Sequence, residues 1–351
     1  MKTSQKNGTV YVRILCAILF CSFSILYLYF YQADILAVSQ HLLSQGQTHY
    51  EKGIGTLLIT LTLFLLHMGM LALTRLTRSW HALTYFPSFL LLGMLTGISP
   101  HVTDTFHLQV NPLVFLGLLL AYLVAVVFAR KGEAFPQHPS AIAYRNLFCM
   151  GAMMLMTGLL GNGDKRFHAY MKAENNLLHG DAPTALAALD GLSLSDSTLT
   201  MLRAFALSQM GQLGDRLFEW QPVGGSDALL PDGKAVRLLL FPESRFYQSM
   251  GVWVSPRPEA RRYFERAATS PHRSRAVGDY QLCAYLLDRD LDAFARMLPA
   301  YYSPADSLLP RYYREALDLM QSPQQVGKQP ARPLQDSDAT TYSHYFHHLV
   351  P

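Results

Sequence analysis

Five runs of apolar residues lie within the first 161 positions, and each is about long enough to cross a bilayer as a helix. The hydrocarbon core of a membrane is about 30 Å thick, which takes about 17–25 helical residues. Only 15% of the chain is charged, and most of these charges follow the apolar runs. The sequence therefore predicts a transmembrane domain over 1–161, with spans near 11–32, 54–74, 83–99, 112–129 and 144–161.

Basic residues alternate from one side of these runs to the other. Three lysines and arginines precede or open the first run, two lie between the second and third runs, and three lie between the fourth and fifth. The alternate loops, 33–53 and 100–111, contain only Lys52. Cytoplasmic loops hold the excess of lysine and arginine in membrane proteins. We therefore expect a membrane protein with a cytoplasmic N-terminus and, after an odd number of crossings, residues 162–351 on the extracytoplasmic side. The eight residues are Lys2, Lys6, Arg13, Arg75, Arg78, Arg130, Lys131 and Arg145.

The net charge of +4 follows from this asymmetry and does not indicate a nucleic-acid partner. Residues 162–351 contain 20 lysines and arginines against 21 aspartates and glutamates, so no basic surface for nucleic acid is expected there. Of the four cysteines only Cys283 lies in this part, which excludes an internal disulfide and a paired-cysteine zinc motif. We expect no cofactor.

Residues 168–190, HAYMKAENNLLHGDAPTALAALD, have the pattern of two helices joined by a Gly-Asp turn. The pattern recurs 31 residues later, where Ala204 takes the place of Ala173 and Gly211 that of Gly180. A looser third copy, YQLCAYLLDRDLDAFARMLPAYY, places Asp290 at its turn. Helical hairpins with a period in the low thirties are typical of tetratricopeptide repeats, so 162–321 is predicted to be a tetratricopeptide-like helical domain.

The rest of this domain is predicted to contain an irregular insertion, two further helices and a tail. Residues 224–246 are rich in Gly, Pro and Asp and are predicted to form a loop or short irregular insertion. Helices are expected over 257–269 and from Ser303-Pro304 to about Gln321, because Ser caps a helix and Pro suits its first turn. Residues 322–351 are predicted to be a poorly ordered tail, since 322–341 are rich in Pro, Gln, Asp and Ser.

Three stretches carry a resemblance to a known group: KAENNLLHGDAPTALAAL (172–189), LTMLRAFALSQMGQLGDRLFEW (199–220) and LPRYYREALDL (309–319). They resemble a family of uncharacterised bacterial multi-pass membrane proteins, a domain of unknown function, with a C-terminal tetratricopeptide-like domain. The resemblance implies an all-α fold and brings no catalytic residues. Many members have more than five spans, so this chain resembles a short form.

Ionisable residues in and near the spans are candidates for chemistry. His67 lies in the middle of the second run, where a hydrogen bond to a neighbouring helix would satisfy a neutral imidazole. Asp34, with His101, Asp104 and His107, lies in the outer loops. Asp34 is the candidate catalytic residue of a glycosyltransferase-like enzyme that uses a lipid-linked substrate. It lacks a second carboxylate, and five spans are few for that fold.

Binding and metal-ligating candidates lie in the domain beyond the spans. Tyr170, Phe205 and Tyr285 occur near expected groove positions, and Arg261 and Arg262 belong to the densest basic stretch. With Glu259 and Glu265 interleaved, that stretch is also the pattern of a solvated, ion-paired helix face. The segment HYFHH brings together three histidines that have the spacing of metal ligands but also fit a terminal amphipathic helix. These are His344, His347 and His348.

The sequence thus predicts an all-α chain with about five transmembrane helices followed by a soluble helical domain. Stacked hairpins bind proteins or extended peptides more often than they catalyse reactions. The first hypothesis is a membrane-anchored adaptor in the bacterial inner (plasma) membrane, whose partners are the lipid bilayer and another envelope protein or peptide. The alternative is a membrane enzyme acting on a lipid-linked substrate through Asp34.

Overall fold

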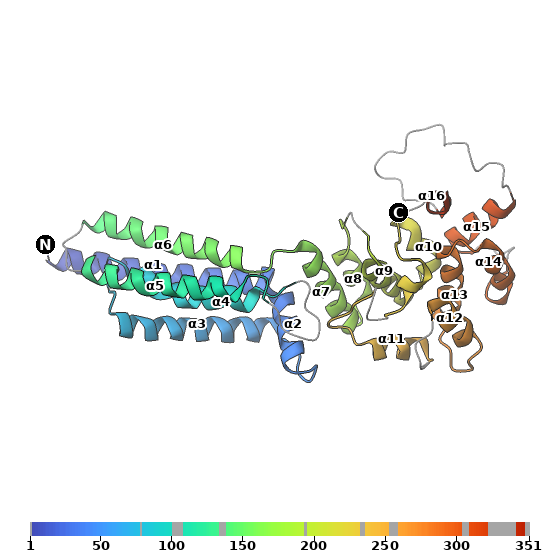
Figure 1. Cartoon of the computed structure of the whole chain (residues 1–351), viewed down its shortest axis with the longest axis horizontal. Coiled ribbons are helices and arrows are strands. Elements are labelled where there is room, and N and C mark those ends of the chain that lie inside the picture. The colour runs from blue at the N-terminus through green and yellow to red at the C-terminus, as the bar shows by residue number, and fades with distance from the viewer. Residues whose placement is uncertain are drawn as a thin grey trace, which may run out of the picture. The chain divides into compact units, whose positions relative to one another are not determined.

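The computed structural model divides the chain into two compact units, Met1–His168 and Ala169–Pro351. Within the described residues every regular element is a helix, and the only β contact is an isolated bridge between Ile98 and Leu108 (Figure 1). The expected all-α class is therefore confirmed. The structure describes residues 2–77, 79–99, 108–132, 138–192, 195–231, 236–252, 259–303, 309–321 and 342–347.

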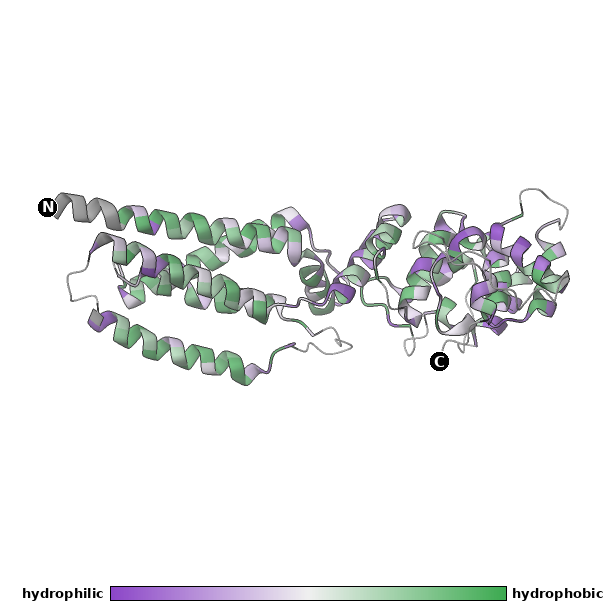
Figure 2. Ribbon diagram, turned by 90° about the horizontal axis from the view of Figure 1, so that it is seen from above, coloured by the Kyte–Doolittle hydropathy of each residue, from purple (hydrophilic) through white to green (hydrophobic). Residues whose placement is uncertain are grey.

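The first unit is a bundle of apolar helices. Four of its helical segments are long and apolar enough to cross a membrane: Val10–Tyr31, Lys52–Thr74, Pro112–Lys131 and Ser140–Leu160. Figure 2 shows the predominance of apolar residues along these helices, in contrast to the mixture of apolar and polar residues in the second unit. The elements are α1 (Lys2–Leu26, extended by a π-helical turn, Tyr27–Tyr31), α2 (Ala33–Leu43), α3 (Lys52–Thr74), a 3₁₀ turn (His81–Tyr85) leading into α4 (Phe86–Thr96), α5 (Pro112–Gly132) and α6 (Pro139–Leu160).

The fifth apolar segment, His81–Thr96, is shorter than the other four. Near its start, the amide of Ala82 donates to the Asn146 side chain in the first half of α6 (2.7 Å). At its end, the amide of Asn162, just beyond α6, donates to the carbonyl of Thr96 (2.8 Å). The segment therefore runs parallel to α6. Four helices long enough to span a membrane and this shorter segment are roughly consistent with the expected number of about five.

Neighbouring helices cover most of α4, although Leu91 and Leu95 are exposed. Ser88, Phe89 and Leu92 are fully buried. Ser88 donates to the carbonyl of Leu63 in α3, and Thr157 of α6 donates to the carbonyl of Phe89. These side-chain to backbone bonds satisfy hydroxyls that would otherwise be costly to bury among apolar helices.

Basic side chains gather at one end of this bundle. Arg130, in the last turn of α5, donates to the carbonyls of Leu73 and Thr74 where α3 ends. The guanidinium of Arg145 lies over the ring of Trp80 (4.6 Å). The opposite end carries hydroxyl and amide side chains instead: Tyr27, Thr96 and Asn162 lie there.

His67 has the structural role expected of it. Its Nδ1 is 2.9 Å from the hydroxyl of Thr84, which belongs to the turn before α4. Its ring stacks on Tyr85 with the centroids 3.6 Å apart. A neighbouring element thus satisfies the buried imidazole, as the sequence predicts.

The second unit consists of short helices. The helix α7 begins in the last residues of the first unit and continues into the second. Short 3₁₀ turns occur at Leu217–Glu219, Gly225–Leu229 and Leu298–Ala300. The helices are α7 (Lys165–Leu178), α8 (Ala182–Ala188), α9 (Ser197–Gln209), α10 (Leu213–Arg216), α11 (Glu243–Met250), α12 (Ala260–Ala268), α13 (Ala276–Leu287), α14 (Leu291–Met297), α15 (Arg311–Gln321) and α16 (Tyr342–His347).

Three helical hairpins in this unit share one turn geometry. The amides of Asp181, Gln212 and Asp290 each donate across the turn to the carbonyl five residues earlier, all at 2.9 Å. The residue before each of these has a positive φ: 78° at Gly180, 68° at Gly211 and 59° at Arg289. This conformation favours glycine, so the third copy adopts the same turn with an arginine. All three hairpins suggested by the sequence are present.

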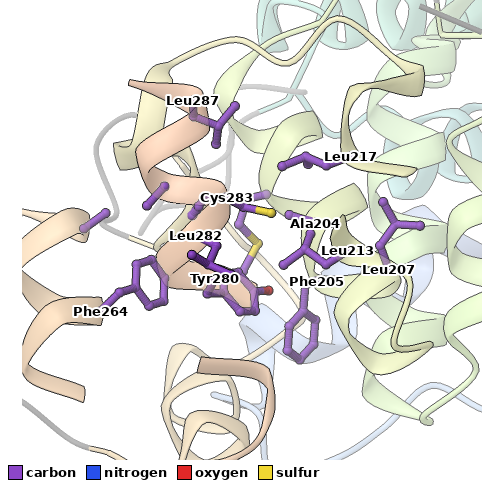
Figure 3. Packing of buried hydrophobic residues seen from close by; sticks show 14 of the residues in the cluster. Ala204, Phe205, Leu207, Leu213, Leu217, Phe264, Tyr280, Leu282, Cys283 and Leu287 are labelled. Atoms are coloured by element: carbon purple, nitrogen blue, oxygen red, sulfur yellow. The ribbon is translucent and has the colours of Figure 1, made fainter. Parts of the chain in front are cut away.

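The core of the unit lies where α13 meets the second hairpin (Figure 3). Tyr280 and Cys283 of α13 are fully buried beside Ala204 of α9 and Leu213 of α10. On the other side of α13, the rings of Phe264 and Tyr280 stack with centroids 5.1 Å apart. Large buried aromatic side chains contribute most of the apolar area in such a core.

Some boundaries differ from those expected. The expected loop 224–246 contains a 3₁₀ turn and already includes the start of α11. The helix expected over 257–269 is Ala260–Ala268, and the one expected to reach Gln321 is described from Arg311. Within the segment expected to be poorly ordered, Tyr342–His347 form α16, because Tyr342 and Tyr345 bury their rings in the core. The remainder of that segment lies outside the described residues.

Candidate functional site

The hairpin unit contains a hollow of about 180 Å³, which we call the hairpin hollow. Three parts of the unit line it: the turn between α7 and α8, the middle and end of α9, and α11 with the residue segment before it. These elements come from distant parts of the sequence. The lining residues are Leu177, Gly180, Ala182, Phe205, Gln209, Phe241, Arg245, Gln248 and Ser249.

The hollow has an apolar floor and a polar rim. Phe205 is 3% exposed, and its ring lies 5.0 Å from that of Phe241. Gln209, Arg245 and Gln248 are exposed at the rim. Such a combination of an apolar floor and a few polar groups is typical of ligand-binding hollows.

Arg245 is the one charged side chain among the residues that line the hollow. Its Nη1 donates to the carbonyl of Leu178 at the end of α7 (2.8 Å). No carboxylate among the described residues lies within ion-pair distance of its guanidinium. The positive charge at the rim is therefore available to a ligand.

Glu174 of α7 fixes the segment before α11, which forms one wall of the hairpin hollow. Its Oε2 accepts hydrogen bonds from three consecutive amides, those of Leu239, Leu240 and Phe241, at 2.8, 2.6 and 3.0 Å. Burial raises the pKa of this fully buried carboxyl to about 7, although the three backbone hydrogen bonds lower it. The position of Phe241 thus depends on one side chain of α7.

Sequence reasoning missed Glu174, although a signal was present. Phe167, Met171 and Leu178 share its helix face at spacings of three or four residues, and Phe167 and Met171 are buried. A carboxylate on an otherwise apolar stripe needs a buried hydrogen-bond partner. The identity of that partner, 65 residues away or more, could not be read from the sequence.

The aromatic residues proposed for a groove take different places. Only Phe205 lines the hairpin hollow. The hydroxyl of Tyr170 donates to the Asp196 carboxylate (2.8 Å). Tyr285 is 3% exposed, and its hydroxyl donates to Glu265 (3.1 Å).

The basic stretch forms an ion-paired helix face. Arg261 bonds to Asp290 at 2.7 Å and to Glu265 at 3.3 Å. Arg262 is exposed and lies 3.5 Å from Glu259. The geometry agrees with the solvated-face interpretation of this stretch.

The histidine candidates are only partly described. His344 and His347 lie in α16, whereas His348 lies outside the described residues, as do His101, Asp104 and His107. Within the described ranges no three His, Cys, Asp or Glu side chains come together as metal ligands would.

Asp34 is paired with a histidine rather than with a second carboxylate. It lies in the first turn of α2, and its Oδ2 is 3.9 Å from Nδ1 of His168. The other ring nitrogen of His168 is 3.0 Å from the carbonyl oxygen of Asn162, which also accepts from the Gln32 amide. Burial lowers the pKa of His168, but the bonds to Asp34 and Asn162 outweigh it and raise the pKa above its ordinary value.

This arrangement favours a protonated imidazole, because Nε2 is at hydrogen-bond distance from the Asn162 carbonyl oxygen and Nδ1 lies at ion-pair distance from the Asp34 carboxylate. A general base needs a free ring nitrogen that can accept a proton. In the pair with Asp34, His168 therefore has the geometry of a tether between α2 and the start of α7.

Comparisons with known proteins give no match: no family model, no curated protein and no solved structure is detectably similar to this chain.

Proposed function

We propose that this chain is a membrane-anchored adaptor of the bacterial envelope, and that the hairpin hollow binds a segment of a partner protein or peptide. The observation that carries the proposal is the hollow itself, which combines a floor that includes Phe205 with the uncompensated charge of Arg245. A partner segment with an apolar side chain next to an acidic group would match both features.

The hairpins support a tetratricopeptide-like assignment for this unit. They share one turn geometry, and the first two are 31 residues apart. Their second helices are short, with 7, 4 and 7 residues in α8, α10 and α14. The proposal is a shortened relative of that repeat class, which binds extended peptides along stacked hairpins.

The clustering of basic side chains supports an orientation in the bacterial inner membrane. Arg75, Arg130 and Arg145 lie at one end of the bundle, near the end of α3 and the starts of α4 and α6. By the positive-inside rule this end is cytoplasmic, and five passes leave the hairpin unit on the extracytoplasmic side. A reporter fused after Pro351 should then be active only outside the cytosol.

Anchoring the hairpin unit to the membrane would strengthen its binding to membrane-associated partners. The spans hold the hairpin unit at the membrane surface, which raises its effective concentration toward partners in or near the same membrane. No chemical step is needed for this role.

Site-specific photo-cross-linking in intact cells tests the proposal. A benzophenone amino acid in place of Gln248, at the rim, should capture a defined partner. The same substitution at Ser244, which is exposed on α11 but does not line the hollow, is the matched control. Arg245→Glu should reduce capture at Gln248, and equal capture at both positions would refute the assignment of the hollow.

A second candidate function, transfer from a lipid-linked substrate, is favoured by one observation. Asp34 and His168 lie together at the polar end of the bundle. An enzyme of this kind would lose its cellular function on Asp34→Asn with normal protein levels, whereas an adaptor working through the hairpin hollow would keep it.

A further inference from the structure

A second hollow lies in the membrane unit, in the angle between α2 and α3, and we call it the membrane hollow. It is an open groove with a volume of about 360 Å³. Sites for small molecules usually have volumes of about 300–1,000 Å³, so this space is sufficient for part of an amphipathic molecule. None of the side chains that line it carries a formal charge.

The lining changes from apolar to polar along the hollow. Leu36 and Ile59 form part of its apolar wall. Ile59 lies seven residues after Lys52, where α3 begins, which is about 10 Å along a helix with a rise of 1.5 Å per residue. The hollow therefore reaches into the part of α3 that crosses the membrane.

Its polar end is formed by the loop after α2. The amide of Gln40 donates to the hydroxyl of Thr48 (3.0 Å), and the hydroxyl of Ser44 accepts from the backbone amide of Thr48 (3.2 Å). These side chains leave further donor and acceptor sites for a polar ligand group. Tyr50 completes the wall, and its ring packs so closely on Gly55 that a Cβ at that position would clash.

The surface around the hollow is one that lipid must cover. Leu43 lines it and is 77% exposed, and Leu57 and Leu58 of α3 are 62% and 58% exposed. In a membrane-spanning helix such side chains contact acyl chains. The ammonium of Lys52 lies 4.2 Å from the Tyr29 ring, an aromatic and basic pair typical of the headgroup level.

We propose that the membrane hollow binds one phospholipid. An acyl chain lies against Leu36 and Ile59, the ester groups face Ser39, Gln40 and Thr48, and the charged headgroup stays outside the uncharged lining. Continuity with the exposed face of α3 selects a lipid over a peptide. The bound lipid fills the space between α2 and α3 and so fixes the angle between them.

Native mass spectrometry of the full chain tests this proposal. The protein is extracted in mild detergent from membranes of phosphatidylethanolamine and phosphatidylglycerol. The wild type should keep one phospholipid per chain through detergent exchange. Ile59→Trp fills the hollow and should weaken retention at least about tenfold, which corresponds to about 1.4 kcal/mol.

A matched control lies on the same helix. Ile54 is the same residue type, is 62% exposed and does not line the hollow, so Ile54→Trp should retain the lipid. Ser39→Trp fills the hollow from α2 and guards against a fold defect specific to α3. Absence of a lipid on the wild type, or equal retention in all three variants, overturns the proposal.

A measurement without variants gives an independent answer. A phosphatidylcholine with a diazirine in its acyl chain is incorporated into nanodiscs with the wild-type protein and photolysed. Cross-links should map to Leu36–Ser44 or to the turn of α3 that contains Ile59. Cross-links distributed evenly over the exposed faces of α3 and α5 would show only the surrounding bilayer and would overturn the proposal.

Discussion

The carboxyl of Glu174 makes the wall of the hairpin hollow sensitive to pH. Two opposing effects act on it: burial favours the neutral acid, whereas three backbone amides on Oε2 favour the carboxylate. A hydrogen bond to a charged group contributes about 1.5–3 kcal/mol, and the loss of hydration of a buried ion costs several kcal/mol. These magnitudes are comparable, and the rise of the pKa from 4.5 to about 7 indicates that burial outweighs the three bonds.

The sign of the pH effect follows from linkage. In the open state, residues 236–241 have moved away from α7 and their hydrogen bonds to Glu174 are broken. Glu174 is then hydrated and its pKa returns to the ordinary value. Between pH 4.5 and about 7 the closed state holds a proton that the open state releases, so rising pH favours opening. Each pKa unit corresponds to about 1.36 kcal/mol, so the closed state loses about 3 kcal/mol across this range.

Hydrogen exchange followed by mass spectrometry measures this directly on the full chain in micelles. After correction for intrinsic rates, the opening free energy of the amides of Leu239–Phe241 should fall by about 1.4 kcal/mol per pH unit and level off above about pH 7. Glu174→Gln is neutral at every pH and should give a flat profile. The helix α9 lacks acidic residues and is the internal control.

A rise in protection with pH would refute the reasoning, because it would mean that the three amides outweigh burial. Identical slopes in the wild type and Glu174→Gln would refute it as well, since another group would then control the segment.

Three further predictions follow from buried contacts. Because the folded-state pKa of His168 is raised, its pair with Asp34 stabilises the fold fully below pH 6.5, and this stabilisation is lost as the pH rises through the folded-state pKa. The thermal unfolding midpoint should therefore fall over that pH range. Asp34→Asn should remove most of this pH dependence. Asn146→Leu leaves the Ala82 amide and the Ser79 carbonyl without their partner, at a cost of about 1–3 kcal/mol per group in reversible unfolding from micelles. A loss under about 0.5 kcal/mol, the size of an exposed substitution, would contradict that role. Gly214→Ala places a Cβ 2.7 Å from the Tyr313 ring and 2.9 Å from Pro310 and should destabilise the hairpin unit by about 1–3 kcal/mol, whereas Gly163→Ala meets nothing within 4 Å and should be neutral.

The spans could be predicted because hydropathy sums over about twenty residues and tolerates local exceptions. The ends were less certain for the shortest run: the segment expected over 83–99 is helical over His81–Thr96. Turn chemistry predicted all three hairpins, including the third, where Arg289 takes the left-handed conformation without a glycine.

The candidate site was harder to predict, because helical spacing identifies a buried face but not what covers it. Phe205 and Tyr285 were expected near a groove, and both are 3% exposed because α11 and α12 pack against them; of the two, Phe205 lines the hairpin hollow. Arg245 and Gln248 lie in a segment with no repeat signal. Their place beside Leu177 is set by contacts between residues far apart in the sequence.

The brevity of α4 has a consequence for how the chain is made. The segment His81–Thr96 emerges from the ribosome well before α6, which supplies the Asn146 and Thr157 side chains that bond to it. With 16 residues, it is below the length that partitions into lipid alone. We therefore expect His81–Thr96 to insert stably into the membrane only after α6 has been synthesised and can pack against it.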